Sequence, residues 1–330
     1  MKDIGIVYMT EKKKSIVTQE LFSKHFMKVF IARQGPFDLI IDYNTLSIGR
    51  RAQAIMQDIP RIYDLADDLA DMIRISPQMN SLIAPFAARF ARRMILKSVR
   101  KAQIVTGTTK PLLDKYEVPS EKGKVIHNGI PANFIEPVEQ SEIIDCRKRQ
   151  EEFLIGYVGV LREWVDFKPI FESIKNLQPT IPIRLIIIGE EGEKDKVIAQ
   201  ADKAGVLSSV SMVGTISHNK IRRYLAACDC GIVPFALTQT SEYALPLKVF
   251  EYLSAGIPVI SSGIRAIKED FADIVWLYED EKSLRNAILE IESNKNMVKE
   301  KVNRGMEKVR VDYTWTGIMR KFDLLIEKVT

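Results

Sequence analysis

Short apolar runs rich in β-branched residues alternate with amphipathic stretches along most of this chain, and no other feature constrains its fold as strongly. The alternation is clearest in the second half, where each run precedes a segment whose apolar residues recur at helical spacing. Strands that alternate with helices predict the α/β class, with parallel sheets covered by helices. The predicted strands are Ile4–Met9, Leu39–Asp42, Arg61–Asp64, Ile104–Thr106, Lys124–Ile126, Leu154–Val158, Arg184–Ile188, Val210–Val213, Cys230–Val233, Pro258–Ser261 and Ile274–Leu277. The first half also predicts helices near Ile16–Arg33, Ser47–Gln57 and Leu82–Lys101.

The length of 330 residues predicts two domains, because it exceeds what one hydrophobic core usually serves. We place the boundary in Asn128–Phe134, which reads NGIPANF and precedes a polar stretch. Asn-Gly tolerates positive φ and proline restricts the chain, so this segment is typical of a turn. Residues 1–131 and 132–311 are therefore expected to form two Rossmann-like, doubly wound domains.

The last residues, 312–330, predict a long amphipathic helix with Thr314 at its N-cap. Its recurring apolar residues are Trp315, Ile318, Met319, Phe322, Leu325, Ile326 and Val329. Such a helix either covers its own domain or packs across onto the first one, and the pattern allows both.

The bulk composition, 46% hydrophobic and 28% charged with a net charge of +5, is that of a globular protein. No window reaches the roughly 18 uncharged apolar residues of a membrane span, and the start of the chain lacks the pattern of a signal peptide. We therefore expect a cytoplasmic protein. The three cysteines and three histidines show neither a disulfide framework nor metal-ligand spacing, so core thiols and no structural metal are expected.

The most informative chemistry lies in Pro246–Ser262, which reads PLKVFEYLSAGIPVISS. This segment predicts a helix that begins near Leu247, ends at Gly256 and returns at once to a strand. A helix N-terminus at the carboxyl end of a parallel sheet favours a phosphate, and Lys248 would add a positive charge there. Glu251 lies one turn further, where a carboxylate can accept hydrogen bonds from ribose hydroxyls. The alternative is an ordinary amphipathic helix whose lysine and glutamate face water.

This segment resembles the donor-site signature of retaining glycosyltransferases of family 4 (glycosyl transferases group 1), in the branch whose motif reads Pro-x-Lys-x-x-Glu-Tyr-Leu-x-x-Gly-x-Pro-Val. Other segments resemble the family in its own order, and the similarity covers most of the chain from about residue 60 onward. They are Tyr63–Asp68 (YDLADD), Lys124–Phe134, Ile155–Phe167, Ile183–Asp195 and Ser209–Phe235.

The resemblance implies a GT-B fold, in which two Rossmann-like domains face a cleft and the last helix crosses back to the first domain. It also implies an enzyme of the EC 2.4 class, hexosyltransferase-like, that moves a sugar from a UDP- or GDP-linked donor to a glycan or lipid-linked acceptor. The transfer would be retaining and metal-independent, with the nucleotide sugar as a substrate and no cofactor. Such a chain would take part in polysaccharide biosynthesis.

The donor-side roles that the resemblance implies fall on residues of the second domain. Glu251 would bind the donor ribose, and Lys248 would lie near the diphosphate. Gly159 would let the backbone approach the phosphates. Gly189 and Val213-Gly214 would line the base pocket through backbone groups.

Two positions depart from the family pattern. The family places an arginine and a lysine one and six residues after the glycine of the first loop, where this chain has Val160 and Val165. Arg162 and Lys168 are therefore offset candidates for a phosphate cation.

The second departure concerns the family's first glutamate, since Tyr243 stands at that position and Glu242 is one residue away. Either a loop brings the Glu242 carboxylate to the donor sugar, or this branch positions the sugar without it. No residue of the chain is identified as a catalytic base.

Four acidic residues, Asp64, Asp67, Asp68 and Asp71, would share one helical face if a helix began early enough. Like charges this close are typical of a solvated face or of a helix N-terminus that interacts with the dipole. The alternatives are a role at the interdomain cleft, including acceptor contact, and a metal cluster. No Asp-x-Asp stands where a metal-dependent transferase would carry its cation.

Residues 79–101 contain only basic charges, which are Arg89, Arg92, Arg93, Lys97, Arg100 and Lys101. Because Phe86, Phe90 and Met94 recur beside them at helical spacing, the segment is typical of a helix that binds an anionic membrane surface. Arg89, Arg92, Arg93 and Lys97 are the candidates for the membrane or acceptor side. The alternative is an ordinary helix with one face in the core and a basic face in water, free in the cytoplasm. Nucleic acid is not expected, since no aromatic platform accompanies the charge.

The N-terminal half resembles the family least. It has no glycine between the strand Ile4–Met9 and Gly35, where the family has a Gly-rich loop, and the domain is short. Some βα units would then be missing or rebuilt. Two functions therefore stay open, an active glycosyltransferase and a catalytically inactive GT-B subunit that binds nucleotide or regulates a transferase complex. A related sugar-nucleotide epimerase fits the segments less well.

Overall fold

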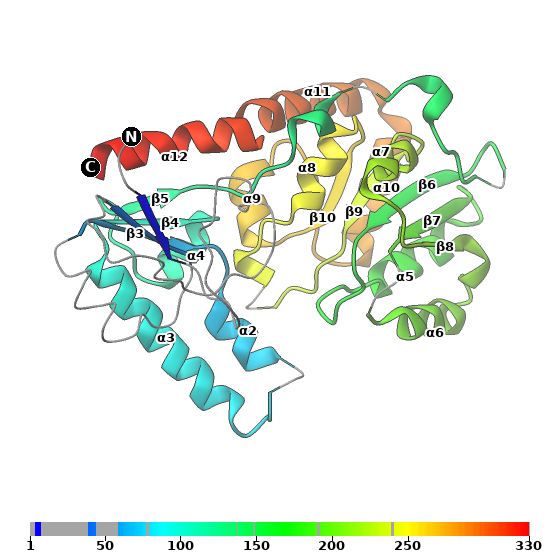
Figure 1. The fold of residues 1–330 in the computed structure, drawn as a ribbon. Helices are drawn as coiled ribbons and strands as arrows, with labels where there is room; N and C mark the ends of the chain where they lie inside the picture. Colours follow the sequence, from blue (N-terminus) through cyan, green and yellow to red (C-terminus); the bar gives the residue numbers. More distant parts are fainter. Residues whose placement is uncertain are drawn as a thin grey trace. The chain divides into compact units, whose positions relative to one another are not determined.

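The structure is a computed structural model of the whole chain, and it describes residues 4–7, 39–43, 59–76, 79–136, 138–147, 149–189, 192–238 and 241–329. The chain forms two compact units (Figure 1). The first unit comprises Met1–His127 together with Met319–Thr330, and the second comprises Asn128–Ile318. The helices predicted near 16–33 and 47–57 lie outside the described residues, as do Met9 and Gly35.

The first unit contains a parallel sheet whose described strands follow one another in sequence order. These strands are β1 (Ile4–Val7), β2 (Leu39–Tyr43), β3 (Arg61–Leu65), β4 (Ile104–Gly107) and β5 (Gly123–Val125). In register, Ile41 pairs with Ile62, and Ile62 pairs with Ile104. Each strand predicted for this half is present. The reversal of strand order that defines a doubly wound sheet is not among these described strands.

The helices of the first unit are α2 (Leu69–Ile75), α3 (Ala84–Lys101) and α4 (Lys110–Lys115). Helix α3 buries mainly small residues, including Ala84, Ala88 and Ala91, which allow it to approach its neighbours closely. The last helix, α12 (Trp315–Val329), adds Phe322 and Leu325 to a core cluster of this unit. The other members of that cluster are Leu39, Ile41, Ile62 and Ile104. The crossing of the last helix to the first unit is therefore confirmed.

The second unit has a six-stranded parallel sheet in the order β11-β10-β9-β6-β7-β8. Its strands are β6 (Phe153–Val158), β7 (Ile183–Ile188), β8 (Val210–Gly214), β9 (Cys230–Val233), β10 (Val259–Ser262) and β11 (Trp276–Tyr278). The chain thus builds outward in one direction through β6, β7 and β8 and then restarts beside β6 with β9. This is the doubly wound order, and its reversal point lies between β6 and β9.

Helices cover both faces of this second sheet. One face packs against α5 (Lys168–Leu177), α6 (Lys194–Ala204) and α10 (Glu281–Ser293). The other face packs against α7 (His218–Leu225), α8 (Leu247–Ser254), α9 (Arg265–Phe271) and α11 (Lys295–Asp312). Short 3-10 helices span Ala132–Ile135, Gln140–Glu142, Leu207–Ser209 and Ser241–Tyr243. Because both faces are covered, the central strands are apolar at nearly every position.

The cysteines of the second unit form no disulfide, and they pack in or against its hydrophobic core. Cys228 belongs to the cluster on one face of the sheet and Cys230 to the cluster on the other. Burial raises the pKa of both thiols well above the usual value, which leaves them unreactive.

Helix ends in this unit follow the local sequence. Gly256 has φ of +77° directly after α8, and Gly205 has φ of +76° after α6, so both helices end on a left-handed glycine. Thr314 accepts a hydrogen bond from the Gly317 N–H at 3.3 Å, which confirms it as the cap of α12.

In the described part of the chain, every helix is too short or too polar to cross a membrane.

Candidate functional site

Three adjacent strands of the second sheet end in glycines with positive φ. Gly159 follows β6 with φ of +137°, Gly189 follows β7 with φ of +131°, and Gly214 ends β8 with φ of +81°. The Gly159 N–H donates to the Ile188 carbonyl at 2.9 Å, and the Gly189 N–H donates to the Gly214 carbonyl at 2.9 Å. A Cβ atom on Gly189 would overlap the Gly159 carbonyl oxygen. This end of the sheet therefore presents backbone groups where any other residue would add a side chain.

A β-bulge separates Val213 from the neighbouring strand. Ile187 pairs with Met212, but Ile188 pairs with Gly214, so Val213 is the extra residue. The Val213 side chain packs against the core cluster on one face of the sheet. Contact of Val213 with a base through its backbone stays a prediction.

A further glycine, Gly192, joins the two loops at this edge, and the sequence reasoning missed it. Gly192 has φ of +94°, and a Cβ atom there would overlap the Leu161 carbonyl oxygen. The Glu193 N–H donates to the same carbonyl at 2.7 Å. The loop after Gly159 is thus fixed against the loop after Gly189. The signal in the sequence was a second glycine three residues after Gly189.

Lys248, in the first turn of α8, points at the Gly159 turn. Its Nζ lies 4.1 Å from the centre of the Tyr157 ring and 5.3 Å from that of Phe235. A Cβ atom on Gly159 would stand 3.1 Å from the same Nζ, so the glycine leaves room for the ammonium group. Lys248 is partly buried, and its position over two rings excludes the alternative in which it faces water.

The electrostatic environment of Lys248 is unusual for a lysine. Burial lowers its pKa to about 7, and the nearby Glu251 carboxylate only partly opposes that shift. Among the described residues, the Lys248 Nζ has no hydrogen-bond or ion-pair partner. A bound anion at the Gly159 turn would supply the missing negative charge.

Two tyrosines hold the backbone around Gly159, and the sequence reasoning had not singled out Tyr157. The Tyr157 hydroxyl donates to the Val160 carbonyl at 2.9 Å, and the Tyr252 hydroxyl accepts from the Val158 N–H at 2.8 Å. Tyr252 is fully buried and its ring lies against Gly231, where a Cβ atom would overlap it. The Tyr of the Pro-Leu-Lys segment is thus a support for the turn.

The remaining predicted donor residues differ in their positions and in their exposure. Glu251 is partly buried one helical turn after Lys248. Glu242 lies in the 3-10 turn before α8, is partly buried, and donates its N–H to the Thr238 carbonyl at 3.2 Å. Arg162 is exposed in the loop after Gly159. Lys168 starts α5, is 75% exposed, and has its Nζ 4.0 Å from Glu172.

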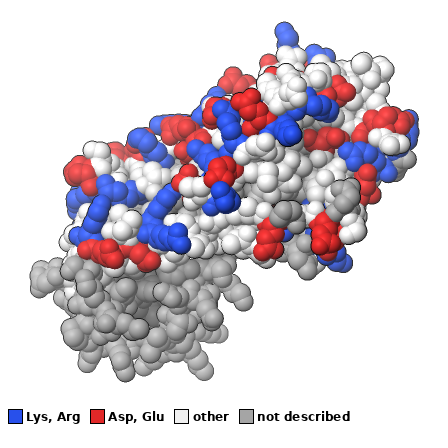
Figure 2. All heavy atoms as spheres, turned by 90° about the horizontal axis from the view of Figure 1, so that it is seen from above, with Lys and Arg blue, Asp and Glu red and all other residues white. Residues whose placement is uncertain are grey.

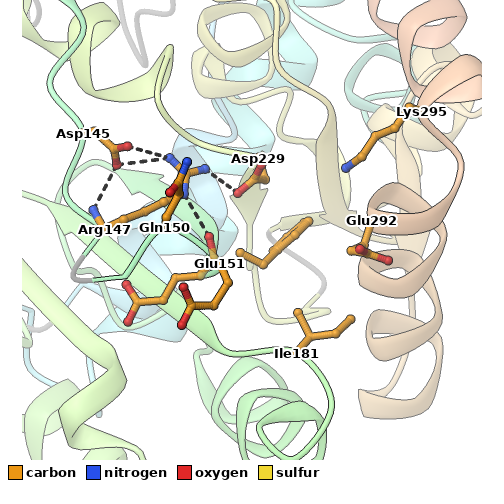
Figure 3. Close-up of a pocket in the computed structure, with 10 residues that line it drawn as sticks. Asp145, Arg147, Gln150, Glu151, Ile181, Asp229, Glu292 and Lys295 are labelled. Atoms are coloured by element: carbon orange, nitrogen blue, oxygen red, sulfur yellow. Dashed lines mark hydrogen bonds and ion pairs between the residues drawn. The ribbon is translucent and has the colours of Figure 1, made fainter.

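The pocket that the structure describes lies at the opposite, amino-terminal edge of this sheet (Figure 3). It has a volume of about 380 Å³, and its lining includes Asp145, Arg147, Glu151, Asp229, Glu292 and Lys295. Arg147 Nη1 lies 3.1 Å from both oxygens of Asp145, and its Nη2 lies 2.6 Å from Asp229. Ligands of open α/β sheets bind outside the carboxyl ends, and several acidic side chains here would repel a diphosphate. We therefore assign the pocket no donor role.

The acidic residues of the first unit do not share a helical face, contrary to the expectation. Asp64 lies on strand β3, where it accepts from the Thr106 hydroxyl at 2.5 Å, and burial raises its pKa to about 6. Asp68 caps α2, accepts from the Tyr116 hydroxyl at 2.7 Å, and with Asp71 forms ion pairs to Lys115. The helix begins only at Leu69, so the N-terminal role is right for Asp68 and Asp71. Within the described residues, no group of three or more His, Cys, Asp or Glu could hold a metal ion.

The basic candidates of α3 fall into two groups. Arg89, Arg93 and Lys97 are exposed. Arg92 is 41% exposed and donates to Glu117 at 3.2 Å, with its guanidinium 6.0 Å from the centre of the Tyr116 ring. Arg92 therefore has protein partners and is separate from the exposed three.

Solved structures with the same architecture define the class of the fold as GT-B. HepE of Anabaena in complex with UDP has 20% identity and a TM-score of 0.69, covering 88% of this chain and 79% of that one. A sucrose-phosphate synthase from Thermosynechococcus elongatus has 16% identity and the same TM-score, over 88% and 73% of the two chains. At such identities the similarity concerns the fold alone.

The family follows from the sequence itself, because residues 139–308, just over half of the chain, match the model of Glycosyl transferases group 1. The chain belongs to that family. The matched range contains the three glycines, Lys248 and Glu251.

Curated relatives are glycosyltransferases by name. A Bacillus subtilis (strain 168) protein named for teichuronic acid biosynthesis, TuaH, is 24% identical over 221 residues, 66% of this chain and 54% of that protein. The chitobiosyldiphosphodolichol beta-mannosyltransferase of Candida albicans is 31% identical over 108 residues, 32% of this chain and 23% of that enzyme. The chain thus spans about half the length of the first relative and under a quarter of the second.

Proposed function

We propose that this chain is an active glycosyltransferase that transfers a sugar from a nucleoside diphosphate sugar to a glycan or lipid-linked acceptor. The observation that carries the proposal is the position of Lys248, whose Nζ lies over the Tyr157 ring beside the Gly159 turn. This turn follows β6 at the reversal point of the sheet, which is where open α/β sheets bind ligands. A diphosphate there would meet backbone N–H groups, the start of α8 and one ammonium group.

The proposed mechanism follows from charge development. Departure of the nucleoside diphosphate builds negative charge on the β-phosphate and positive charge on the sugar. Lys248 and the first turn of α8 are fixed before the reaction and would stabilise the negative charge without a metal ion. Arg162, exposed in the loop after Gly159, is the candidate for a second cation, whereas Lys168 is 75% exposed at the start of α5 beside Glu172 and is not proposed as one. Retention of the anomeric configuration is proposed from the family 4 resemblance of the Pro-Leu-Lys segment.

The nucleoside would lie across the three glycines. Glu251 would accept hydrogen bonds from the ribose hydroxyls, and Gly189, Val213 and Gly214 would contact the base through their backbone groups. Glu242 is the candidate for a contact with the donor sugar. UDP is the first nucleotide to test, because HepE has been solved with UDP and with UDP-glucose. GDP is the second.

The acceptor side is proposed from chemistry and from the names of the relatives. TuaH is named for teichuronic acid biosynthesis, and the Candida enzyme is named for a dolichol-linked substrate. Both names support a glycan or lipid-linked acceptor in polysaccharide biosynthesis. We further propose a cytoplasmic chain attached peripherally to the inner membrane face, with the exposed Arg89, Arg93 and Lys97 of α3 on anionic lipid.

Turnover of the donor tests the central proposal. The purified chain is incubated with UDP-glucose and, in parallel, GDP-mannose, and release of free nucleotide is followed with and without a membrane extract as acceptor source. We expect one donor to be consumed, and Glu251→Ala to lose roughly tenfold or more in kcat/KM through weaker ribose binding. Glu172→Ala, an exposed carboxylate on α5, is the matched control. Tight nucleotide binding without any turnover would instead indicate an inactive subunit and contradict the proposal.

A further inference from the structure

Exposed apolar side chains gather where α2 and α3 meet. Six large hydrophobic side chains exposed by more than a third lie in this short part of the chain, and we call them the α2–α3 tip. They are Met72, Ile75, Leu82, Ile83, Phe86 and Phe90. Leu82 is 79% exposed, Phe86 76% and Phe90 59%. Figure 1 shows α2 and α3 side by side, with the end of α2 and the start of α3 away from the sheet of this unit.

The tip is not the core face of an amphipathic helix. Helix α3 turns Ala84, Ala88, Ala91, Ile95 and Val99 inward. Its phenylalanines therefore share the exposed side with the basic residues, which differs from the alternative in which only basic residues face water. An exposed Phe side chain forgoes the favourable free energy of burial, so a cluster of them is typical of an interaction surface.

The exposed side of α3 changes from apolar to basic side chains along the helix axis. Phe86 and Phe90, which belong to the tip, lie in the first half of α3. Arg93 and Lys97 follow on the same side, at spacings of three and four residues. With a rise of 1.5 Å per residue, Arg93 lies roughly 10 Å further along the helix than Phe86. Interfacial segments bury their apolar face about 5–10 Å into the boundary between headgroups and acyl chains, and this separation is of that size.

The charge of this part of the chain also fits anionic lipid. Residues 79–101 contain six basic side chains and no acidic one. Elsewhere the signs are mixed: over α11 and α12, Lys and Arg are interspersed with Asp and Glu (Figure 2), as in the Arg310–Glu307 pair. Within residues 79–101, the helix that carries the exposed phenylalanines therefore has an unbalanced positive charge.

We infer that the α2–α3 tip inserts into the headgroup region of an anionic bilayer, with Phe86 and Phe90 below the phosphates and Arg93 and Lys97 among them. The inference rests on the peripheral attachment proposed above and goes beyond it. Adsorption by charge alone would disappear at high salt, because salt screens exposed charges. Insertion of apolar side chains leaves a component of binding that salt does not remove.

The test is sedimentation of the full chain with phosphatidylcholine vesicles, with and without phosphatidylglycerol, at low and high salt. We expect binding to the anionic vesicles that persists in part at high salt. The double variant Phe86→Ser/Phe90→Ser should lower the salt-resistant partition coefficient roughly tenfold or more. Leu324→Ser is the matched control, since Leu324 is 59% exposed on α12, as Phe90 is on α3.

Each outcome separates the alternatives. Binding that vanishes at high salt and is equal for the parent chain and the double variant would overturn insertion and leave adsorption by charge. No binding to either vesicle would overturn both attachment and insertion, while donor turnover would still report on the enzyme. If light scattering shows a dimer that the double variant dissociates, with no lipid binding, the tip is an interface between copies and the inference is wrong. An unchanged melting temperature of the variant verifies that it is folded.

Discussion

The two units are built from the same elements, parallel strands joined by helices, yet their strand ends carry different chemistry. In the second unit, β6, β7 and β8 end in Gly159, Gly189 and Gly214, which present backbone groups alone. In the first unit, β4 also ends in a glycine, Gly107, but without positive φ, while the ends of β2 and β3 carry side chains such as Tyr43 and Asp64. A backbone surface suits the constant parts of a nucleotide, whereas side chains suit a partner that varies among relatives.

The strand order differs as well. The second sheet reverses between β6 and β9, which opens a position for a ligand at the carboxyl edge. The described strands of the first sheet follow the sequence, and its core depends on a helix from the far end of the chain. We therefore predict that substitutions in the last helix destabilise the first unit, and that substitutions of the three glycines impair the second unit.

The largest expected effect is on stability. Phe322→Ala should destabilise the first unit by about 3–5 kcal/mol, because it empties a site between α12 and strands β2 to β4. Urea unfolding followed by circular dichroism measures the loss. Leu324→Ala, on the same helix but 59% exposed, should stay within about 0.5 kcal/mol of the parent chain. Equal effects of the two substitutions would show that α12 does not stabilise the first unit as described.

The next largest effect is expected at Gly189, one of the three positive-φ glycines at the carboxyl ends of β6, β7 and β8. Gly189→Ala should cost about 1–3 kcal/mol, since the residue has φ of +131° and its Cβ would overlap the Gly159 carbonyl. The same change should abolish detectable nucleotide binding by moving the Gly159 turn. Gly123→Ala on β5 is the control, because its φ is not left-handed and its Cβ would come no closer than 3.3 Å, to the Val118 side chain. A Gly189→Ala chain that binds nucleotide normally would refute the role of this edge.

The smallest expected effect, on affinity, is a dependence on pH. The pKa of Lys248 is about 7 in the free chain, against 10.5 in an exposed lysine, and a bound diphosphate would favour its charged form. Donor binding should therefore take up a proton, and affinity should fall as pH rises above 7. For UDP-glucose, whose diphosphate does not titrate in this range, the dissociation constant should rise about thirtyfold between roughly pH 6 and 8.5. Calorimetry in buffers of different ionisation enthalpy checks the proton uptake, and its absence would contradict the shift.

The titration of Lys248 changes stability with pH in the opposite direction to its effect on donor affinity. Between the two pKa values the unfolded chain holds more protons than the folded one, so this group raises stability as pH increases from 7 to 10.5. Replacing Lys248 with methionine should therefore stabilise the free chain most below pH 7 and least near pH 10. Melting temperatures across this range supply the check.

The sequence predicted the elements well because local patterns determine them. Apolar β-branched runs located every strand described here, usually to within two residues, and Gly256 marked the end of α8. The contact between Lys248 and Tyr157 could not be predicted, because it joins residues far apart along the chain through the packing of α8 on β6. Asp64 was predicted at the end of the strand Arg61–Asp64 and, on condition of an early helix start, on a shared helical face; the structure places it on strand β3. For Phe86 the sequence left a membrane-binding face and a core-packed helix open, because periodicity does not say which face of a helix the core takes.

The most direct test of the central claim is a calorimetric titration of UDP into the parent chain, Lys248→Met and Lys168→Met near pH 6.5. Both substitutions remove one positive charge, but only Lys248 lies at the Gly159 turn, while Lys168 is paired with Glu172 on the surface. We predict that Lys248→Met weakens binding by roughly tenfold to a hundredfold, the usual size of a charge-assisted contact, and that Lys168→Met changes it less than threefold. Equal losses in the two variants, or undiminished binding in Lys248→Met, would contradict the assignment of the donor diphosphate to this turn.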